Sequence, residues 1–480
     1  MNGTVECVNI LVLEASTSSA KAMVYSSEGE ILREHSAPYR GREFSVAVQN
    51  PQKVLEGLLT VGKEAAEGFP IDGISLGGTW HSLLLADRAG RPKTDCYTWA
   101  YTGAADTAAR FRQDEGETVR YYHKTGCMTH STYPFFKWLH LGEEGLSLRP
   151  GDQLMTQGAY IYYQLTGQAV ESVSMASGSG FLNLHSRTWD GELLERASLG
   201  EENFPRLEEH TYTSSLRGDM AGILGLQAGI PVIPAHPDGA LNQVGSGALG
   251  DGVMTLSAGT SGAIRMAFDR PYLPVHPSIW CYCAPGKYLA GAATSGCTNC
   301  LDWFAGQVLG GRYSLRELDQ MAEASGPDTP VFLPFLFGER CPGWHDSRLG
   351  GFLGVKGSHS PGQLYRAILE GALFNLYQCY EVLTREAYSP REIRASGGVM
   401  KSPLWLQMLA DIFGREITVH PSEQASMLGA AALGLTALGA MDSPERFPVG
   451  EGKVICPNPE NRVLYQEKYA RYRESYARVL

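Results

Sequence analysis

The chain has 480 residues, more than a single hydrophobic core usually serves, so its length predicts two domains. Its 40 basic and 51 acidic residues give a formal net charge of −11 without a basic cluster, which argues against nucleic acid or an anionic membrane as a partner. No apolar run approaches the ~20 residues that a membrane span needs. With this charge, an anionic substrate would need donors placed locally around it.

The first predicted elements are three strands. They span residues 8–14, 20–25 and 31–36. The first strand is almost entirely apolar until it ends at Glu14, and a turn of small polar residues, 15–19, separates it from the second. This strand end therefore carries both a carboxylate and several hydroxyl groups.

A helix and a further strand follow. Asn50 and Pro51 predict a helix start, because Asn is a good N-cap and Pro suits the first helical position. The apolar strand 71–76 then runs into a glycine-rich loop that carries Trp80 and His81. Strands that end in such loops are where α/β proteins place ligands.

The midpoint of the sequence looks like a seam between two lobes. An apolar run, 230–234, is followed by Asp238 in a turn between Pro237 and Gly239, where a side chain can be presented at a strand end. After a glycine-rich connection, residues 256–266 predict a strand, a glycine-rich turn and a second strand.

An internal repeat links this seam to the start of the chain. At one constant offset, residues 15–20 resemble residues 258–263, and Thr17 corresponds to Thr260. One such turn alone would be an ordinary Ser/Thr/Gly hairpin. The pair at matching positions favours two equivalent strand–turn–strand openings that close onto one ligand in a cleft between the lobes.

The second half is predicted to contain several helices. Helices are expected at 295–308, 315–324, 361–385 and 404–413, with a short strand at 393–395. The diglycine turn Gly397-Gly398 lies between that strand and the last helix, where missing side chains let a flat group approach the backbone. Ser402 and Pro403 are a good N-cap and first residue for the helix.

The ten cysteines have no regular spacing, and the first residues lack a signal-peptide pattern, so we expect a reducing compartment, the cytoplasm. Two close pairs, Cys281 with Cys283 and Cys297 with Cys300, could supply four thiolates to zinc. The first pair falls in a predicted strand and the second at a helix start. We therefore interpret them as small core residues.

Seven motifs carry a resemblance in their order and spacing. They are residues 14–21, 80–82, 175–180, 237–240, 259–262, 338–342 and 397–411. Over nearly its full length the chain resembles the FGGY family of carbohydrate kinases, and within it the gluconokinase-like branch. The resemblance implies an α/β fold with two actin-like, ribonuclease H-like lobes: residues 1–245 as an N-terminal sugar-binding lobe and 246–480 as a C-terminal nucleotide-binding lobe. ATP and the sugar would lie in the cleft between them.

The resemblance also implies roles for single residues. A kinase places a carboxylate beside the attacking hydroxyl to take its proton, and Asp238 is the candidate base. An Asp-Gly turn alone would be a common structural feature. Trp80 and His81, with Asp238, would bind the sugar. Mg²⁺ would bridge the phosphates, with Glu14 (through a water molecule) and Asp238 as the candidates to hold it.

Glycine-rich turns offer backbone N–H groups and hydroxyls to phosphates. The residues expected to bind ATP phosphates are Thr17, Ser18, Gly259, Thr260, Ser261 and Gly262. Those expected beside adenine are Gly397, Gly398 and Val399. Glu339 and Arg340 are expected to form a buried structural pair rather than to take part in catalysis.

Four positions depart from the family pattern. Ser16 replaces the glycine of Asp-x-Gly-Thr, where a side chain would cost about 1 kcal/mol if the backbone needed a positive φ. Glu14 replaces the aspartate of the same motif. Tyr101 and Gly103 stand where gluconokinase-like members carry Asp and Arg.

Two functions therefore stay open. The first is ATP-dependent phosphorylation of a primary hydroxyl of a sugar or sugar acid, gluconate-like or a ketose. The second is a catalytically impaired homologue that binds a nucleotide or sugar. The expected partner is a small-molecule substrate, not nucleic acid or a membrane, and a homodimer is one option for the assembly.

Overall fold

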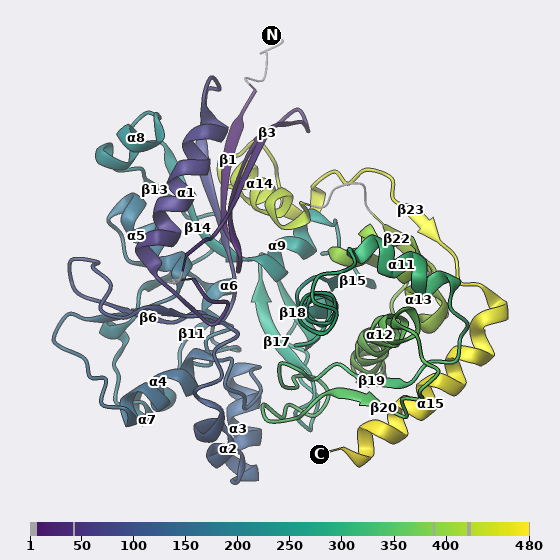
Figure 1. Ribbon diagram of the computed structural model, residues 1–480. Coiled ribbons are helices and arrows are strands. Elements are labelled where there is room, and N and C mark those ends of the chain that lie inside the picture. Colours follow the sequence, from purple (N-terminus) through teal and green to yellow (C-terminus); the bar gives the residue numbers. More distant parts are fainter. Residues whose placement is uncertain (1–6, 42–43, 387–388, 420–423, 480) are drawn as a thin grey trace.

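The computed structural model describes residues 7–41, 44–386, 389–419 and 424–479. Two mixed β-sheets, each with helices packed against it, form the two halves of the molecule (Figure 1). The six-stranded sheet has the order β13-β14-β5-β1-β2-β3, and the seven-stranded sheet has the order β17-β18-β16-β15-β21-β22-β23.

The first sheet is built from strands of the first half of the chain. They are β1 (Asn9–Ala15), β2 (Ser19–Ser26), β3 (Ile31–Pro38), β5 (Gly73–Gly78), β13 (Ser214–Ser215) and β14 (Pro231–Pro237). The helices are α1 (Pro51–Ala66), α2 (Ala105–Arg112), α3 (Glu115–Thr125), α4 (Pro134–Glu143), α5 (Gln157–Thr166), α6 (Val173–Ala176), α7 (Gly191–Arg196), α8 (Gly218–Leu224) and α9 (Asp238–Gly245). Short strands pair outside the sheet: β4 (Val48–Gln49), β6 (Leu84–Ala86), β7 (Cys96–Tyr97), β8 (Gln153–Met155), β9 (Val170–Ser172), β10 (Leu182–Asn183), β11 (Thr188–Trp189) and β12 (Arg206–Glu208).

The second sheet and its helices come from the second half. The strands are β15 (Val253–Ala258), β16 (Gly262–Phe268), β17 (Trp280–Ala284), β18 (Lys287–Thr294), β21 (Glu392–Ser396), β22 (Ile417–Val419) and β23 (Lys453–Ile455), and β19 (Val331–Leu333) pairs with β20 (Gly351–Leu353). The helices are α10 (Thr298–Trp303), α11 (Leu315–Ala324), α12 (Pro361–Glu386), α13 (Pro403–Phe413), α14 (Ala425–Ala437) and α15 (Arg462–Arg478).

The two sheets repeat one topology, which confirms the repeat predicted from the sequence. In the first, β1 pairs with β5 in parallel and with β2 in antiparallel orientation. In the second, β15 pairs with β21 in parallel and with β16 in antiparallel orientation. The order β14-β5-β1-β2-β3 thus matches β22-β21-β15-β16-β18. The turn at Thr17 and the turn at Thr260 occupy equivalent places in the two sheets.

Several helix boundaries follow from local chemistry. Asn50 caps α1 as predicted, since its side-chain oxygen accepts from the N–H groups of Gln52 and Lys53 at 3.0 and 3.1 Å. The helix predicted from residue 295 begins only at Thr298, because Asn299 turns back to accept from the N–H of Cys297 at 2.8 Å. A π-helical segment, Phe304–Val308, continues it.

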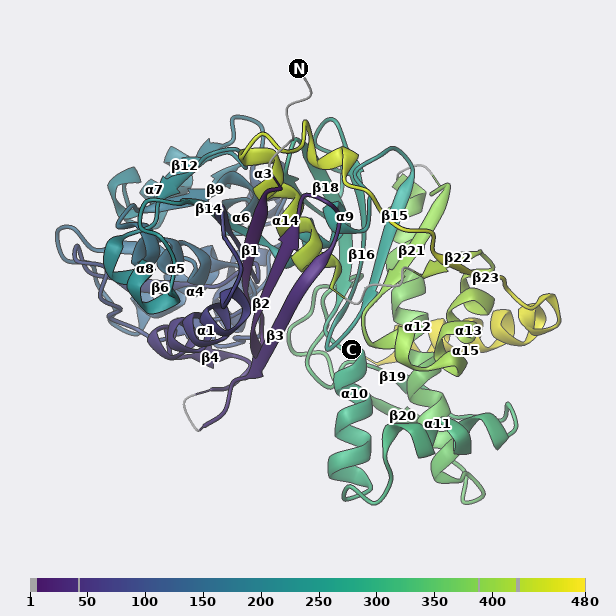
Figure 2. The same cartoon turned by 90° about the horizontal axis from the view of Figure 1, so that it is seen from above.

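Helix α14 joins the two halves. Although it lies between β22 and β23 of the second sheet in sequence, it packs against α9, β1 and β5 of the first half, as Figures 1 and 2 show beside β1. A Cβ at Gly434 of α14 would lie 2.7 Å from Ile10, whereas one at Gly62 of α1 would lie 2.8 Å from Leu13. Ile10 and Leu13 point to opposite faces of β1, so α1 and α14 cover the two faces of the first sheet.

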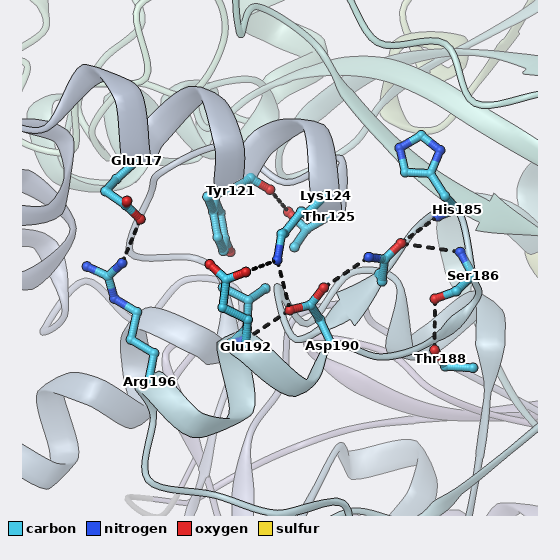
Figure 3. A network of polar contacts seen from close by, with 12 residues as sticks. Glu117, Tyr121, Lys124, Thr125, His185, Ser186, Thr188, Asp190, Glu192 and Arg196 are labelled. Atoms are coloured by element: carbon cyan, nitrogen blue, oxygen red, sulfur yellow. Dashed lines mark hydrogen bonds and ion pairs between the residues drawn. The ribbon is translucent and has the colours of Figure 1, made fainter.

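The outer part of the first half is held by a polar network between α3 and α7 (Figure 3). Arg196 donates to Glu117 at 2.8 Å, and Lys124 binds both Asp190 and Glu192. Arg196 and Glu192 are exposed, so we expect the pairs that they form to contribute less than about 1 kcal/mol each, whereas Asp190 is buried.

The close cysteine pairs are core residues, as predicted. Cys281 and Cys283 lie on β17, Cys297 and Cys300 lie around the start of α10, and all four are buried. In the described ranges, no set of three or more His, Cys, Asp or Glu side chains is arranged to hold a metal ion. No helix among the described residues is long and apolar enough to cross a membrane.

Candidate active site

Asp238 lies where strand β14 ends and helix α9 begins. The expected turn between Pro237 and Gly239 is wrong in detail, because Asp238 is the first residue of α9 and Pro237 is its N-cap. Burial raises the pKa of this carboxyl to about 6. The charge of Arg265 opposes that rise, and the charge of Glu14 adds to it. A carboxyl with a pKa near neutrality suits a general base.

This raised pKa predicts a pH-dependent cost to stability. Asp238 ordinarily titrates at 3.8, so the folded protein holds the proton more tightly, and stability falls as pH rises from about 4 to about 6. An Asp238→Asn variant should therefore exceed the wild type in free energy of unfolding at pH 8 by about 1–2 kcal/mol, but not at pH 4. Thermal unfolding at both pH values tests this. Equal stability at pH 8 would contradict the raised pKa.

Glu14 is the penultimate residue of strand β1 and is buried. It faces Lys21 across the β1–β2 pair, and the Lys21 ammonium binds its Oε1 at 3.1 Å. The second carboxylate oxygen, Oε2, is also buried but has no hydrogen-bond partner among the described residues. A buried carboxylate oxygen without a partner is costly and is a candidate ligand for a cation.

Arg265 of β16 brings a positive charge close to Asp238. Its Nη1 donates to the hydroxyl of Ser257 at 3.0 Å, while its buried Nε has no partner among the described residues. A Cβ at Gly239 would lie 2.9 Å from this Nε and 2.5 Å from the ring of Trp80. Glycine at 239 therefore lets the arginine approach the start of α9.

The neighbouring charges predict opposite shifts of the acid limb in a pH profile. With Asp238 as the general base, kcat/KM is expected to fall below about pH 6. Glu14→Gln removes a negative neighbour and should move this limb to lower pH, whereas Arg265→Gln removes a positive neighbour and should move it to higher pH, by about half a unit or more in each case. Profiles of kcat/KM for both variants measure the shifts. Limbs that move in the same direction would exclude Asp238 as the titrating group.

Trp80 and His81 follow β5, as the sequence predicted. His81 has a left-handed backbone, with φ of 68°, which is uncommon for a non-glycine residue and typical of functional sites. Its Nδ1 lies 2.7 Å from the carbonyl oxygen of Gly178, and burial lowers its pKa to about 3. A neutral ring that donates from Nδ1 keeps Nε2 as an acceptor. Trp80 donates to the carbonyl of Ser174 at 3.0 Å and packs on Tyr282.

Lys137 is a residue of this site that sequence analysis missed. Its ammonium group is fully buried in α4 and donates to the carbonyl oxygens of His81 and Thr98 at 2.5 and 2.6 Å. Burial lowers its pKa to about 7. Lys137 thereby joins the loop after β5 to the segment before Trp99. A single lysine within the aromatic run of 135–138 was the available signal.

The first hydroxyl-rich turn needs no glycine at residue 16. Ser16 has no positive φ, and its N–H and hydroxyl both donate to the carbonyl oxygen of Ser19, at 3.0 and 2.8 Å. The penalty expected for a side chain here therefore does not arise. Thr17 accepts a 3.0 Å hydrogen bond from Trp99, and the side chain of Ser18 is exposed.

A cleft of about 700 Å³ lies between the two halves. Residues from both halves line it, among them Trp99, His130, Thr260, Ser295, Asn299 and Arg340. The guanidinium of Arg340 lies over the ring of Trp99, 5.3 Å from its centroid. Because Trp99 also binds Thr17, the first turn adjoins the same cleft that Thr260 of the second turn lines.

Tyr101 and Gly103, two of the departures from the family pattern, form one packed unit. The Tyr101 ring lies 4.8 Å from that of Tyr97, and a Cβ at Gly103 would lie 2.2 Å from the Tyr101 hydroxyl. Thr102 between them lines the cleft. Glycine at 103 thus accommodates the tyrosine.

The second glycine-rich turn joins β15 and β16 and packs on the start of α10. The N–H of Thr298 donates to the carbonyl oxygen of Gly259 at 2.9 Å. Gly397 has φ of 87°, and a Cβ there would lie 2.8 Å from the carbonyl oxygen of Ala258. A Cβ at Gly398 would lie 2.8 Å from Thr298. The two glycine turns therefore meet at the end of β15.

A second pocket of about 600 Å³ opens beside these turns. Its lining includes Thr298, Asp319, Gly398, Lys401, Ser402 and Leu404. Neither Gly397 nor Val399 is among the described residues that line it, and the Val399 side chain is fully buried. One carboxylate oxygen of Asp319 is buried without a hydrogen-bond partner there.

Glu339 and Arg340 do not form the expected pair. Glu339 binds Arg348 at 3.0 Å and accepts from Tyr476 at 2.5 Å. Arg340 instead donates to the carbonyl oxygen of Thr294 at 2.8 Å and faces the cleft. Adjacent residues of an irregular segment point in different directions, so their sequence proximity did not predict pairing.

Comparison with known proteins places this architecture. Residues 9–245 match the N-terminal domain model of the FGGY family of carbohydrate kinases, and residues 254–438 match its C-terminal domain model. The chain belongs to the FGGY family of carbohydrate kinases. The two-lobed, actin-like fold predicted from the sequence is confirmed, and this FGGY protein is a phosphotransferase of the sugar kinase type.

The relatives of this FGGY chain include two kinds of kinase. A gluconokinase from Bacillus subtilis is 29% identical over 90% of this chain and 88% of its own length. A xylulose kinase from Staphylococcus epidermidis is 25% identical over 97% of this chain and 96% of its own length. A crystal structure of gluconate kinase from Lactobacillus acidophilus has a TM-score of 0.90 and 27% sequence identity, and the match covers 98% of this chain and 97% of that one. A crystal structure of ligand-bound xylulose kinase from the same organism has a TM-score of 0.89 and 28% sequence identity, and the match covers 97% of both chains.

Proposed function

We propose that the protein transfers the γ-phosphoryl group of ATP to a primary hydroxyl of a sugar or sugar acid, with Asp238 as general base. The observation that carries this proposal is the environment of Asp238. Asp238 is the first residue of α9, which lies between the two sheets. Its carboxyl has a pKa of about 6 and lies near Arg265 and Glu14. Such a group is ionised at neutral pH yet basic enough to accept a proton.

Asp238 would accept the hydroxyl proton as the oxygen attacks phosphorus. Trp80 and His81 would hold the acceptor, with the neutral His81 Nε2 accepting a hydrogen bond from a sugar hydroxyl. His81 is held in its unusual conformation by Gly178 and Lys137, so the acceptor side of the site is preorganised.

The two hydroxyl-rich turns would bind the phosphates of ATP. Thr17, Ser18, Thr260 and Ser261 would supply hydroxyls, and Gly259 and Gly262 would let the phosphates approach the backbone of the second turn. The N–H of Gly259 itself donates to the carbonyl oxygen of Ser261 at 3.0 Å. The pocket beside Gly398 has the size for a nucleoside, and we assign adenine to it. We also propose lobe limits at residues 1–245 and 246–480, which put the acceptor site mainly on the first lobe and the nucleotide on the second.

Glu14 and Asp238 suit a magnesium ion that arrives with ATP. The fit rests on the unpartnered, buried Oε2 of Glu14 and on its electrostatic coupling to Asp238. When bound, Mg²⁺ would neutralise charge on the transferring phosphate. Lys21 holds the other oxygen of Glu14, so Glu14 would reach the metal through Oε2.

The test is ADP release over a panel of aldonates, ketoses and polyols, with Asp238→Ala as the control. The proposal predicts ADP release that depends on at least one acceptor and is lost in the variant. ATP binding without acceptor-dependent ADP for any panel member would favour a catalytically impaired nucleotide- or sugar-binding protein instead.

A further inference from the structure

Arg340 carries a partly buried positive charge for which the protein supplies little compensation. Its guanidinium makes one hydrogen bond, to the carbonyl oxygen of Thr294, and its buried Nε has no partner among the described residues. No carboxylate of the described chain lies within 4.0 Å of it, and the ionisable groups that act on its pKa most strongly, after burial, are tyrosines and cysteines. Buried charges in proteins are normally paired.

Arg265 adds a second positive charge nearby. The charge of Arg340 lowers the pKa of Arg265, and Tyr282 acts to raise the pKa of both arginines, so the two lie in one region of the site. Arg265 also has an unpartnered buried Nε, and it forms no ion pair within 4.0 Å with a described residue. Asp238 is the one nearby carboxylate that acts on Arg265, and Lys21 already holds Glu14.

Arg340 therefore brings a positive charge without a paired carboxylate to the cleft, because Asp346, a carboxylate that also lines the cleft, is bound by Ser131 and His130. Arg340 lines the cleft, and its guanidinium lies over the ring of Trp99, 5.3 Å from the centroid. A guanidinium can bind a carboxylate through two parallel hydrogen bonds. A neutral ketose or polyol would desolvate this charge without pairing it. A carboxylate would pair it.

We propose that Arg340, assisted by Arg265, binds the carboxylate of a sugar acid, so that the acceptor is an aldonate rather than a neutral ketose or polyol. This inference rests on the kinase function proposed above. In this proposal the positive charge comes from β16 and from the segment after β19, and not from the positions of Tyr101 and Gly103.

The first experiment compares substrates on the wild-type protein. Acceptor-dependent ADP release is measured with D-gluconate and with the polyol of equal length in which CH₂OH replaces the carboxylate, and with D-xylulose. The proposal predicts a kcat/KM for gluconate at least about 10-fold above that for either neutral compound. A higher kcat/KM for a neutral acceptor would overturn the carboxylate site and leave the kinase intact. No turnover of any acceptor would count against the kinase itself.

The second experiment removes the charge. Arg340→Gln should raise KM for gluconate about 10- to 100-fold, with kcat and the KM for ATP within about threefold of wild type, and should leave the neutral polyol nearly unaffected. Arg340→Lys keeps the charge but loses the planar group that can make two parallel hydrogen bonds, so its KM for gluconate should lie between those of the wild type and Arg340→Gln. This variant replaces Arg340→Gln in the test if the glutamine variant does not fold. Arg91→Gln, an exposed arginine paired with Asp87, is the matched control and should change nothing. Equal losses for acidic and neutral acceptors, or a raised KM for ATP, would assign Arg340 to the phosphates and overturn the proposal.

Discussion

Replacing Asp238 with asparagine is expected to lower kcat by about 10³-fold, because asparagine keeps the shape of the side chain but cannot accept the proton of the attacking hydroxyl. The measurement is initial ADP release at saturating ATP and acceptor. Asparagine can still donate and accept hydrogen bonds at the start of α9, so the KM values for both substrates should stay within a few-fold of wild type.

Two comparisons separate this effect from misfolding. The variant should be at least as stable as the wild type at pH 8, for the reason given above, and it should bind ATP with unchanged affinity by calorimetry. A loss of kcat below 10-fold in a folded variant would show that another group, or water, accepts the proton.

Replacing Gly429 with alanine should give the largest loss of stability, about 2–3 kcal/mol. Gly429 lies in α14 where this helix crosses α9, and a Cβ there would lie 2.0 Å from the carbonyl oxygen of Leu241. Gly245 of α9 faces the same crossing, since its Cβ would lie 1.9 Å from the carbonyl oxygen of Ala425. The two glycines allow the helix backbones to touch, so an added methyl group must push them apart.

The matched control is Gly222→Ala in α8. Gly222 also lies within a helix, but nothing lies within 4 Å of a Cβ built there, so alanine should stabilise by about 0.5–1 kcal/mol through its higher helix propensity. Both variants are compared by urea unfolding followed by circular dichroism. A Gly429→Ala variant as stable as Gly222→Ala would contradict the close crossing. Because α9 begins with Asp238, the Gly429→Ala variant should also lose activity at urea concentrations below its unfolding midpoint.

The features that sequence predicted well are local or repeated. The Asn50 cap, the strand that ends at Glu14 and the turn at Thr17 depend on neighbouring residues, and the matching segment at Thr260 revealed the two equivalent sheets. The position of Asp238 at a strand end was predicted, but not that it begins a helix. Its immediate sequence, with proline before and glycine after, is equally typical of a turn.

The features that sequence did not predict depend on contacts between distant segments. Arg265 lies within strand β16, which is mostly buried. A single arginine among apolar neighbours is the signal that the sequence offers for it. Arg340 was assigned to Glu339 because the two are adjacent, whereas the true partner of Glu339, Arg348, follows a loop. The crossing of α14 over α9 joins residues almost 190 positions apart, for which periodicity carries no information.

The most direct test of the central claim is to follow the fate of the γ-phosphorus by ³¹P NMR with Mg²⁺, ATP and D-gluconate. The account predicts a phosphate monoester of the sugar acid together with ADP, and no monoester with Asp238→Asn over the same time. Inorganic phosphate as the only product, or unchanged ATP under conditions where calorimetry detects its binding, would contradict it.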